Sequence, residues 1–170
     1  MDYKINLVDA KQLKLEDSFF EKSKICESIL RGLPQWFGIE EALLNYLAEI
    51  EKLPTILASI DNEYAGFLSF KRHNKYTAEL YIIAVCSKYQ RQGIGRALVD
   101  RTESILCQQG FEYWQVKTLA PSHPSPFYER TRNFYLRIGF RPLEELTQLW
   151  GRDNPCLLMV KYLNCVEIAP

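Results

Sequence analysis

The sequence predicts an α/β domain built on a mixed, mostly antiparallel central sheet with flanking helices. Apolar runs at residues 54–60, 64–70 and 77–85 are joined by turns too short for a crossover, so these strands must pair antiparallel. The run at 77–85 and a later one at 111–119 are instead separated by a segment with apolar residues at helical spacing. That order predicts a βαβ unit, with parallel pairing and a right-handed crossover.

The N-terminal third is expected to be mainly helical. Residues 3–8 alternate enough to form a first strand, and residues 16–30 show the apolar pattern of an amphipathic helix that ends at Gly32 and Pro34. A second helix is predicted over 39–53. Its buried stripe would consist of Leu43, Leu44, Leu47 and Ile50.

The C-terminal half is expected to complete the sheet. A proline-rich loop is predicted over 120–127, followed by a helix over 129–138 that Gly139 stops. Two closing strands are predicted near 140–147 and 156–163. A chain of 170 residues is long enough for one good core, so residues 1–170 are expected to form a single domain.

Composition argues against several classes of function. The formal net charge is zero, which disfavours a broad nucleic-acid surface or an anionic membrane as partner. The five cysteines are dispersed and contain no Cys-x-x-Cys pair, so we expect reduced thiols in a cytoplasmic protein rather than disulfides or a zinc site. No run resembles a signal peptide or is long enough to span a bilayer. Of the two histidines, His73 is expected to be exposed, and His123 has no partners at ligand spacing, so no metal is predicted.

The most informative stretch is residues 80–98. A β-branched strand breaks, passes through Gly93 and Gly95, and continues with apolar residues at helical spacing. Backbone N–H groups at a helix start have no partner within the helix, and the helix dipole places partial positive charge there. Glycine lacks the Cβ atom that would keep a phosphate away from those groups. The stretch therefore predicts a site for a phosphorylated ligand.

Three kinds of phosphate site can be compared with this turn. A P-loop would need Lys followed by Ser or Thr after its last glycine, where Arg96 and Ala97 stand. A dinucleotide fingerprint would need Gly or Ala where Leu98 stands. The hexapeptide Gln90-Arg91-Gln92-Gly93-Ile94-Gly95 resembles the acetyl-CoA signature of the GNAT N-acetyltransferase superfamily, Gln/Arg-x-x-Gly-x-Gly/Ala. The resemblance implies acetyl-CoA as the cosubstrate.

A second stretch also resembles the GNAT superfamily. Residues 133–140, Asn-Phe-Tyr-Leu-Arg-Ile-Gly-Phe, match its Phe-Tyr-x-x-x-Gly-Phe segment, in which a helix ends and a strand begins. In that family the tyrosine hydroxyl lies beside the sulfur of coenzyme A and acts as general acid, a role that the resemblance gives to Tyr135. The alternative is an aromatic residue packed in the core. The family often has Asn seven residues earlier, where Tyr128 stands, so this hydroxyl either replaces that cofactor contact or the contact is lost.

The resemblance also implies the rest of the cofactor site. The main chain at Ile83 is expected to polarise the thioester carbonyl, and the main chain near Val85 to bond the pantetheine amides. With Tyr128, the expected cofactor contacts are Ile83, Val85, Gln90, Arg91, Gln92, Gly93, Ile94, Gly95 and Arg96. Cys86 is the nearest thiol to this turn, and it is interpreted as structural because no paired histidine is evident.

Acetyl transfer to an amine also requires a base. A lysine-like amine has a pKa of ~10.4, so it arrives as an ammonium ion and must lose a proton before it attacks. Glu79 lies eleven residues before Gln90, the spacing at which some GNAT members carry a general-base glutamate. On a strand it would share a face with Ile83 and Val85, where partial desolvation would make it a stronger base. The alternative is an ordered water as base, with Glu79 a solvated strand-end charge.

The acceptor is expected near the connector between the first two helices, which commonly walls the acceptor site in GNAT enzymes. Trp36 and Phe37 with Glu40 would suit a cationic small molecule, although the two aromatics could equally be core or hinge anchors. The sequence thus predicts direct acetyl transfer from acetyl-CoA to a small-molecule amine by a monomer or homodimer. The alternatives are a protein N-terminal or lysine acetyltransferase, and a non-catalytic acetyl-CoA-binding module.

Overall fold

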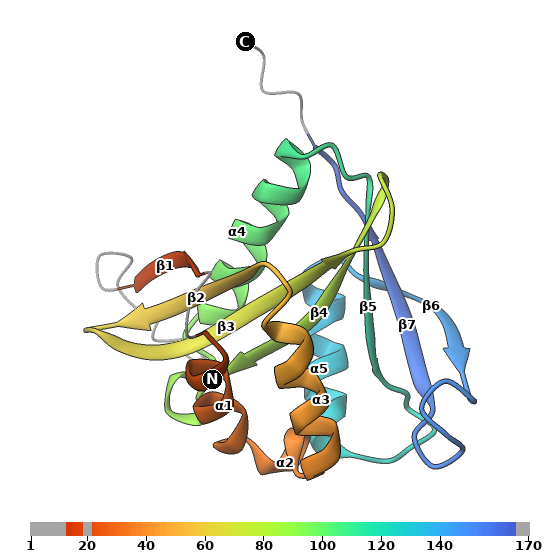
Figure 1. The fold of residues 1–170 in the computed structure, drawn as a ribbon. Helices are drawn as coiled ribbons and strands as arrows, with labels where there is room; N and C mark the ends of the chain where they lie inside the picture. The colour runs from red at the N-terminus through yellow and green to blue at the C-terminus, as the bar shows by residue number, and fades with distance from the viewer. Residues whose placement is uncertain (1–12, 19–21, 166–170) are drawn as a thin grey trace, which may run out of the picture. The chain divides into compact units, whose positions relative to one another are not determined.

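The computed structural model describes residues 13–18 and 22–165 of the chain (Figure 1). Its elements are, in order, β1 (Leu13–Ser18), α1 (Lys22–Arg31), α2 (Pro34–Phe37), α3 (Glu40–Ile50), β2 (Thr55–Ile60), β3 (Glu63–Arg72), β4 (Thr77–Val85), the 3₁₀ turn η1 (Ser87–Tyr89), α4 (Ile94–Gln108), β5 (Tyr113–Leu119), α5 (Pro126–Arg137), β6 (Arg141–Leu146) and β7 (Cys156–Tyr162). The strands form one seven-stranded sheet in the order β1-β2-β3-β4-β5-β7-β6.

The pairing of the strands confirms the predicted fold class. β4 and β5 pair in parallel, with Thr77 opposite Tyr113, and they are connected through helix α4. The β1–β2, β2–β3, β5–β7 and β6–β7 pairs are antiparallel. The sheet is therefore mixed and mostly antiparallel, because only a connection as long as α4 can return the chain for a parallel pairing.

The chain divides into two compact units, and the first comprises the described residues up to Phe70 together with Ile82–Thr102. Its β2–β3 hairpin turns at Asp61 and Asn62, whose φ angles of 50° and 66° are those of the type I′ turn that matches strand twist. Helices α1 and α3 bury apolar stripes that include Cys26, Ile29 and Leu30 in α1 and Leu43, Leu47 and Ile50 in α3.

The second unit comprises Lys71–Tyr81 and the described residues from Glu103 onward. Its core is aromatic: Trp114 of β5 and Phe140 are fully buried, and their ring centroids lie 5.5 Å apart. Helix α5 begins at Pro126, after Ser125, whose hydroxyl accepts a hydrogen bond from the backbone N–H of Tyr128. Helix α5 ends before Gly139, whose φ of 101° is accessible mainly to glycine.

The N-terminal prediction is partly wrong. The helix expected over 16–30 begins only at Lys22, and residues 13–18 form strand β1, whose Leu15 pairs with Ala58 of β2. Pairing with an exposed strand edge outweighs local helical spacing there. Leu44, expected in the buried stripe of α3, is 52% exposed. The connector at residues 34–37 is itself a short helix, and the strand expected at 3–8 lies outside the described residues.

The expectation that all five cysteines are reduced thiols is wrong for one pair. Cys107 near the end of α4 and Cys165 after β7 form a disulfide, with their Cα atoms 5.3 Å apart. They are 58 residues apart in sequence, so no short motif signals the pair. Cys26, Cys86 and Cys156 are free thiols.

Two further features are absent from the described part of the chain. No helix there combines the length and the apolar character that crossing a membrane requires. Residues 13–18 and 22–165 also contain no group of three or more His, Cys, Asp or Glu side chains able to hold a metal ion.

Candidate active site

The glycine turn lies in the first unit, between the end of β4 at Val85 and the start of α4 at Ile94. The carbonyl of Gly93 accepts the N–H of Ala97, so the helix starts at this glycine and the preceding N–H groups are left without partners inside the helix. Gly93 has a φ of 87°, and Arg91 also has a positive φ, of 61°. Residues of opposite handedness in succession can aim their N–H groups at one point as an anion-binding nest, and the positive φ angles of Arg91 and Gly93 fit that pattern.

Two glutamine side chains hold this turn. The amide of Gln90 donates to the carbonyl of Val85 at 3.0 Å, and the amide of Gln92 donates to the carbonyl of Lys88 at 2.9 Å. Both side chains therefore stabilise the conformation of the loop itself. Arg91 and Arg96 are exposed beside the turn, and Arg96 also pairs with Asp100 at 2.9 Å.

Gly95 contributes in a different way from Gly93. It is the second residue of α4 and is not among the residues with positive φ, so its backbone conformation does not require glycine. What it supplies is the missing side chain next to the free N–H groups. The left-handed conformation of Arg91 was not foreseen from the sequence, because non-glycine residues adopt it rarely.

Strand β4 alternates as the sequence indicates. Leu80, Ile82 and Ala84 are buried, whereas Ile83 and Val85 on the opposite face are half-buried. Beside the end of this strand, a Cβ on Gly66 of β3 would lie 2.7 Å from the carbonyl oxygen of Ala84, so the two backbones approach too closely for a side chain. Ile83 and Val85 are also the two residues whose main chains are predicted to contact the cofactor.

The Cys86 thiol follows β4 directly. Burial raises its pKa above the ordinary value, and its Sγ donates to the carbonyl of Tyr64 at 3.6 Å. A thiol whose pKa is raised carries little thiolate, and the thiolate is the nucleophile. This environment fits a structural residue better than an acetyl carrier.

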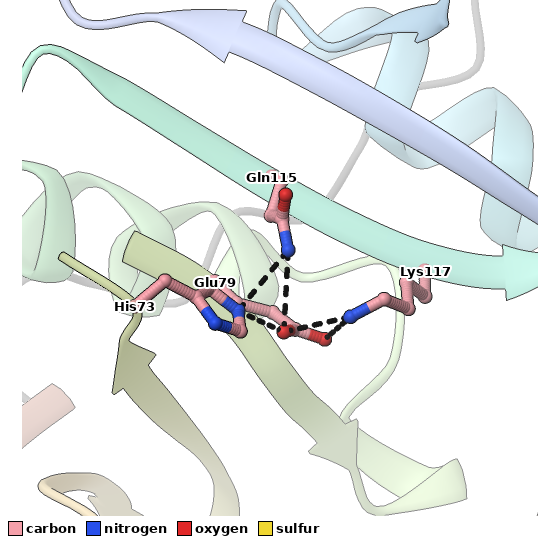
Figure 2. A network of polar contacts seen from close by, with 4 residues as sticks. All are labelled: His73, Glu79, Gln115 and Lys117. Atoms are coloured by element: carbon pink, nitrogen blue, oxygen red, sulfur yellow. Dashed lines mark hydrogen bonds and ion pairs between the residues drawn. The ribbon is translucent and has the colours of Figure 1, made fainter. Parts of the chain in front are cut away.

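A polar network surrounds Glu79 in the second unit (Figure 2). The ammonium group of Lys117 donates to both carboxylate oxygens of Glu79 at 2.9 Å. The Nε2 atom of His73 lies 2.5 Å from Oε2 of Glu79, and the amide of Gln115 lies 3.4 Å from the same oxygen. One buried carboxylate thus receives three partners, from the β3–β4 connection and from β5.

The parallel register brings these residues together. Glu79 lies directly opposite Gln115, and Lys117 is two residues further along the same face of β5. His73 lies in the turn before β4, where its backbone N–H donates to the carbonyl of Thr77 at 2.9 Å. His73 is exposed, as expected from the sequence, and its imidazole, one-third exposed, is also bonded to Glu79, which was not expected. The missing information was the register of β4 against β5, which joins residues 38 positions apart.

Tyr135 is buried in helix α5 of the second unit, with 5% of its surface exposed. Its ring lies between those of Phe134 and Phe140, with centroids 5.7 and 5.8 Å away. The ring is therefore fixed by aromatic packing, which leaves its hydroxyl as the only group with chemistry to offer.

The predicted acceptor residues belong to the first unit. Trp36 and Phe37 of α2 are half-buried, and the ring of Phe37 meets Tyr46 edge-on at 5.9 Å. Glu40 is exposed, and its two oxygens accept hydrogen bonds from the two terminal nitrogens of Arg31 at 2.8 and 2.9 Å. Those hydrogen bonds hold the pKa of the Glu40 carboxyl below its usual value. The carboxylate of Glu40 is thus ionised and already has a guanidinium partner.

Residues 19–140 match the profile of the acetyltransferase (GNAT) family. An uncharacterised N-acetyltransferase of Chlorobaculum tepidum is 27% identical over 115 residues, which is 66% of this chain and 66% of that protein. A GNAT-family acetyltransferase from Desulfovibrio desulfuricans has the same fold, with 18% identity, a TM-score of 0.76, and coverage of 89% of this chain and 99% of that one. A GNAT acetyltransferase from Elizabethkingia anophelis with acetyl-CoA bound gives 19% identity, a TM-score of 0.70 and coverage of 89% and 99%.

These likenesses agree with the motifs. The family match covers most of the chain and includes both the glycine turn and the segment around Tyr135. The chain spans 66% of the length of the Chlorobaculum protein. The chain therefore belongs to the GNAT acetyltransferase family, whose fold holds acetyl-CoA in a solved structure.

Proposed function

We propose that this protein transfers an acetyl group from acetyl-CoA directly to the primary amine of a small cationic molecule. The observation that carries the proposal is the nest at the start of α4, formed by the left-handed residues Arg91 and Gly93. Free backbone N–H groups and the positive end of a helix dipole are matched to a pyrophosphate. Acetyl-CoA combines that group with the acetyl thioester that the reaction needs.

The cofactor is expected to bind with its pyrophosphate over residues 91–96. Arg91 and Arg96 are exposed there and add positive charge, while Gln90 and Gln92 support the loop through their backbone hydrogen bonds. The main chain at Ile83 and Val85 is proposed to bond the thioester carbonyl and the pantetheine amides. Tyr128, in the first turn of α5, is proposed as a polar contact in place of the usual asparagine.

Tyr135 is proposed as the general acid that protonates the departing thiolate. A thiolate is a moderately basic leaving group, with thiol pKa ~8.5 by analogy with cysteine, so a phenol can donate to it as the C–S bond breaks. Packing of the Tyr135 ring between Phe134 and Phe140 supports this role, because a fixed donor needs no reorganisation during the reaction.

Glu79, with the residues hydrogen-bonded to it, is proposed to promote removal of a proton from the acceptor ammonium. Support comes from its buried position on β4 and from its hydrogen bond to His73, a second group able to accept protons. The raised pKa of the Cys86 thiol supports direct transfer without an acetyl-enzyme.

A cationic small molecule is proposed as acceptor because two aromatic side chains lie on α2 and an ionised carboxylate lies at the start of α3. Trp36 and Phe37 would attract the cation through their rings, and Glu40 through its charge. The fold alone does not select the acceptor: the solved structures of the same fold include an aminoglycoside 6'-N-acetyltransferase and the ribosomal-protein-S18-alanine N-acetyltransferase of Escherichia coli. A panel of polyamines, aminoglycosides and peptides with free amines, read by mass spectrometry, decides between the two.

The cofactor site is tested by calorimetric titration of acetyl-CoA, NAD and ATP into wild-type protein and two variants of α4. Gly95→Val places a branched side chain against the free N–H groups, and Ser104→Val places the same side chain on an exposed position of the same helix. We expect acetyl-CoA to bind wild type and Ser104→Val equally, and Gly95→Val at least tenfold more weakly without loss of folding. Equal acetyl-CoA affinity in a folded Gly95→Val protein would remove the site from this turn.

A further inference from the structure

The accessible end of the Glu79 network is His73. The Glu79 side chain is 7% exposed, whereas the His73 side chain is 33% exposed. Both Glu79 oxygens already face Lys117, and Oε2 also receives His73 and Gln115. The imidazole is therefore the more accessible of the two groups to an acceptor amine or to a water that carries its proton.

The contacts also assign the charge of Glu79. The ammonium of Lys117 lies 2.9 Å from both oxygens of Glu79, so the carboxylate has its counter-ion in place. Figure 2 shows Lys117 and His73 approaching the carboxylate from different sides. Glu79 is thus best described as a fixed negative charge that orients its neighbours.

An ionised Glu79 determines the tautomer of His73. Two acceptors cannot lie 2.5 Å apart without a hydrogen between them, so the Nε2 atom of His73 carries the hydrogen and donates it to Oε2 of Glu79. The amide of Gln115 lies 3.1 Å from that nitrogen. Because Nε2 of His73 already carries a hydrogen, the amide donates its hydrogen bond to the carboxylate oxygen instead. In a neutral imidazole with hydrogen on Nε2, the Nδ1 atom holds a lone pair and is the basic nitrogen.

We propose that His73 is the group that accepts the proton from the acceptor ammonium, with Glu79 as its positioning residue and Lys117 as the residue that keeps Glu79 ionised. This inference rests on the proposed function. The N–H bond of the ammonium breaks, its electron pair stays on the amine nitrogen, and the proton forms a bond to Nδ1 of His73. The amine nitrogen then attacks the thioester carbon and loses a second proton to water as the C–S bond breaks with its electron pair on sulfur. The thiolate takes its proton from Tyr135, which recovers a proton from water. The resulting imidazolium is stabilised by Glu79 through Nε2–H, and it returns its proton to water after the amide has formed.

The charged groups around the imidazole are consistent with this role. Glu79 lies beside it on β4, and Lys117 lies on β5 next to Glu79. The neighbouring Arg72 donates a hydrogen bond to the side-chain oxygen of Gln109 at 3.0 Å. Before the reaction the charges of Glu79 and Lys117 cancel each other. A proton on His73 therefore adds one positive charge directly beside a carboxylate. An ion pair that only held β4 to β5 would stabilise the fold but would leave the pH dependence of the reaction unchanged.

The decisive variant is His73→Gln. Its amide nitrogen takes the place of Nε2 and can still donate to Glu79, but it has no basic nitrogen in place of Nδ1. We expect the melting temperature and acetyl-CoA affinity to stay close to wild type while kcat/KM for the amine falls about 10²-fold near neutral pH. The deficit should shrink as the pH rises, because the free amine then forms without a base. His123→Gln, the same substitution at the chain's other histidine, should change neither value.

A second measurement does not depend on activity. In protein labelled with ¹⁵N-histidine, the ring nitrogens of His73 should report the tautomer with hydrogen on Nε2, and the His123→Gln variant assigns the signals. Hydrogen on Nδ1 in the neutral ring would overturn the inference, because Glu79 would then carry the proton. A His73→Gln enzyme with the rate and pH profile of wild type would also overturn the inference. If wild type acetylates no amine, the proposed function fails, and the tautomer still decides whether Glu79 holds His73 as described.

Discussion

Replacing Lys117 by Met should destabilise the protein, because it leaves the Glu79 carboxylate buried without its cation. The ammonium of Lys117 contacts both oxygens of Glu79 at 2.9 Å, and the two side chains are 24% and 7% exposed. Removing one partner of a buried ion pair costs ~3–5 kcal/mol. His73 and Gln115 remain as donors and the lysine is partly solvated, so we expect a loss below that range, ~2–3 kcal/mol.

The assay is urea unfolding and thermal unfolding, both followed by circular dichroism, with wild type, Lys117→Met, Glu79→Gln and the double variant in one cycle. A loss of that size should lower the melting temperature by about 4–12 °C in a chain of this length. The double variant should recover part of the stability, because it leaves no unpaired charge. Lys24→Met, at an exposed lysine of α1, is the control and should stay within ~0.5 kcal/mol of wild type.

The reasoning would be refuted by a Lys117→Met protein as stable as wild type, with additive effects in the cycle. That result would mean that Glu79 is protonated or solvated in the folded state. The assignment of the hydrogen on His73 would then lose its basis, since it depends on an ionised Glu79.

Three further predictions concern the reaction. Tyr135→Phe should lower kcat by roughly 10²-fold with unchanged acetyl-CoA affinity, since the lost proton donation matters mainly as the thiolate departs. Stopped-flow detection of the released thiol measures this, and an unchanged rate where chemistry is limiting would exclude Tyr135 as the acid. Glu79→Gln should flatten the rise of kcat/KM with pH, because the imidazole loses the charge that stabilises its protonated form; a profile parallel to wild type would separate Glu79 from the proton transfer. Trp36→Ala should raise the acceptor KM by roughly five- to thirtyfold, the equivalent of ~1–2 kcal/mol of cation–π attraction, and leave acetyl-CoA binding intact. Loss of acetyl-CoA binding with a normal acceptor KM would place the connector on the cofactor side.

The elements with strong local signals could be predicted from the sequence. Strand β4 has the predicted boundaries, Thr77–Val85, because its apolar alternation ends in a polar turn at one end and a break at the other. The hairpin at Asp61 and Asn62 and the parallel pairing across α4 follow from turn chemistry and connection length. Two short motifs were enough to predict the GNAT family, and the family match over residues 19–140 confirms that prediction.

The parts that depend on long-range contacts could not be predicted. Strand β1 exists because Leu13–Ser18 adds to the edge of β2, and nothing within those residues distinguishes them from a helix start. The disulfide between Cys107 and Cys165 and the pairing of Glu79 with Lys117 join positions 58 and 38 residues apart. His73 carries no sequence signal beyond its polar turn, because its importance comes from the register that brings Glu79 and Gln115 together.

A single-turnover experiment with acetyl-labelled acetyl-CoA tests direct transfer most directly. The enzyme is mixed with labelled acetyl-CoA, with and without an amine acceptor identified by the panel, and the label is located by mass spectrometry in intact protein and in small molecules. We predict that the label moves to the amine at the rate of thiol release and that no acetylated protein forms when the amine is absent. Label on the protein, on Cys86 or elsewhere, that chases into the amine at the turnover rate would contradict direct transfer.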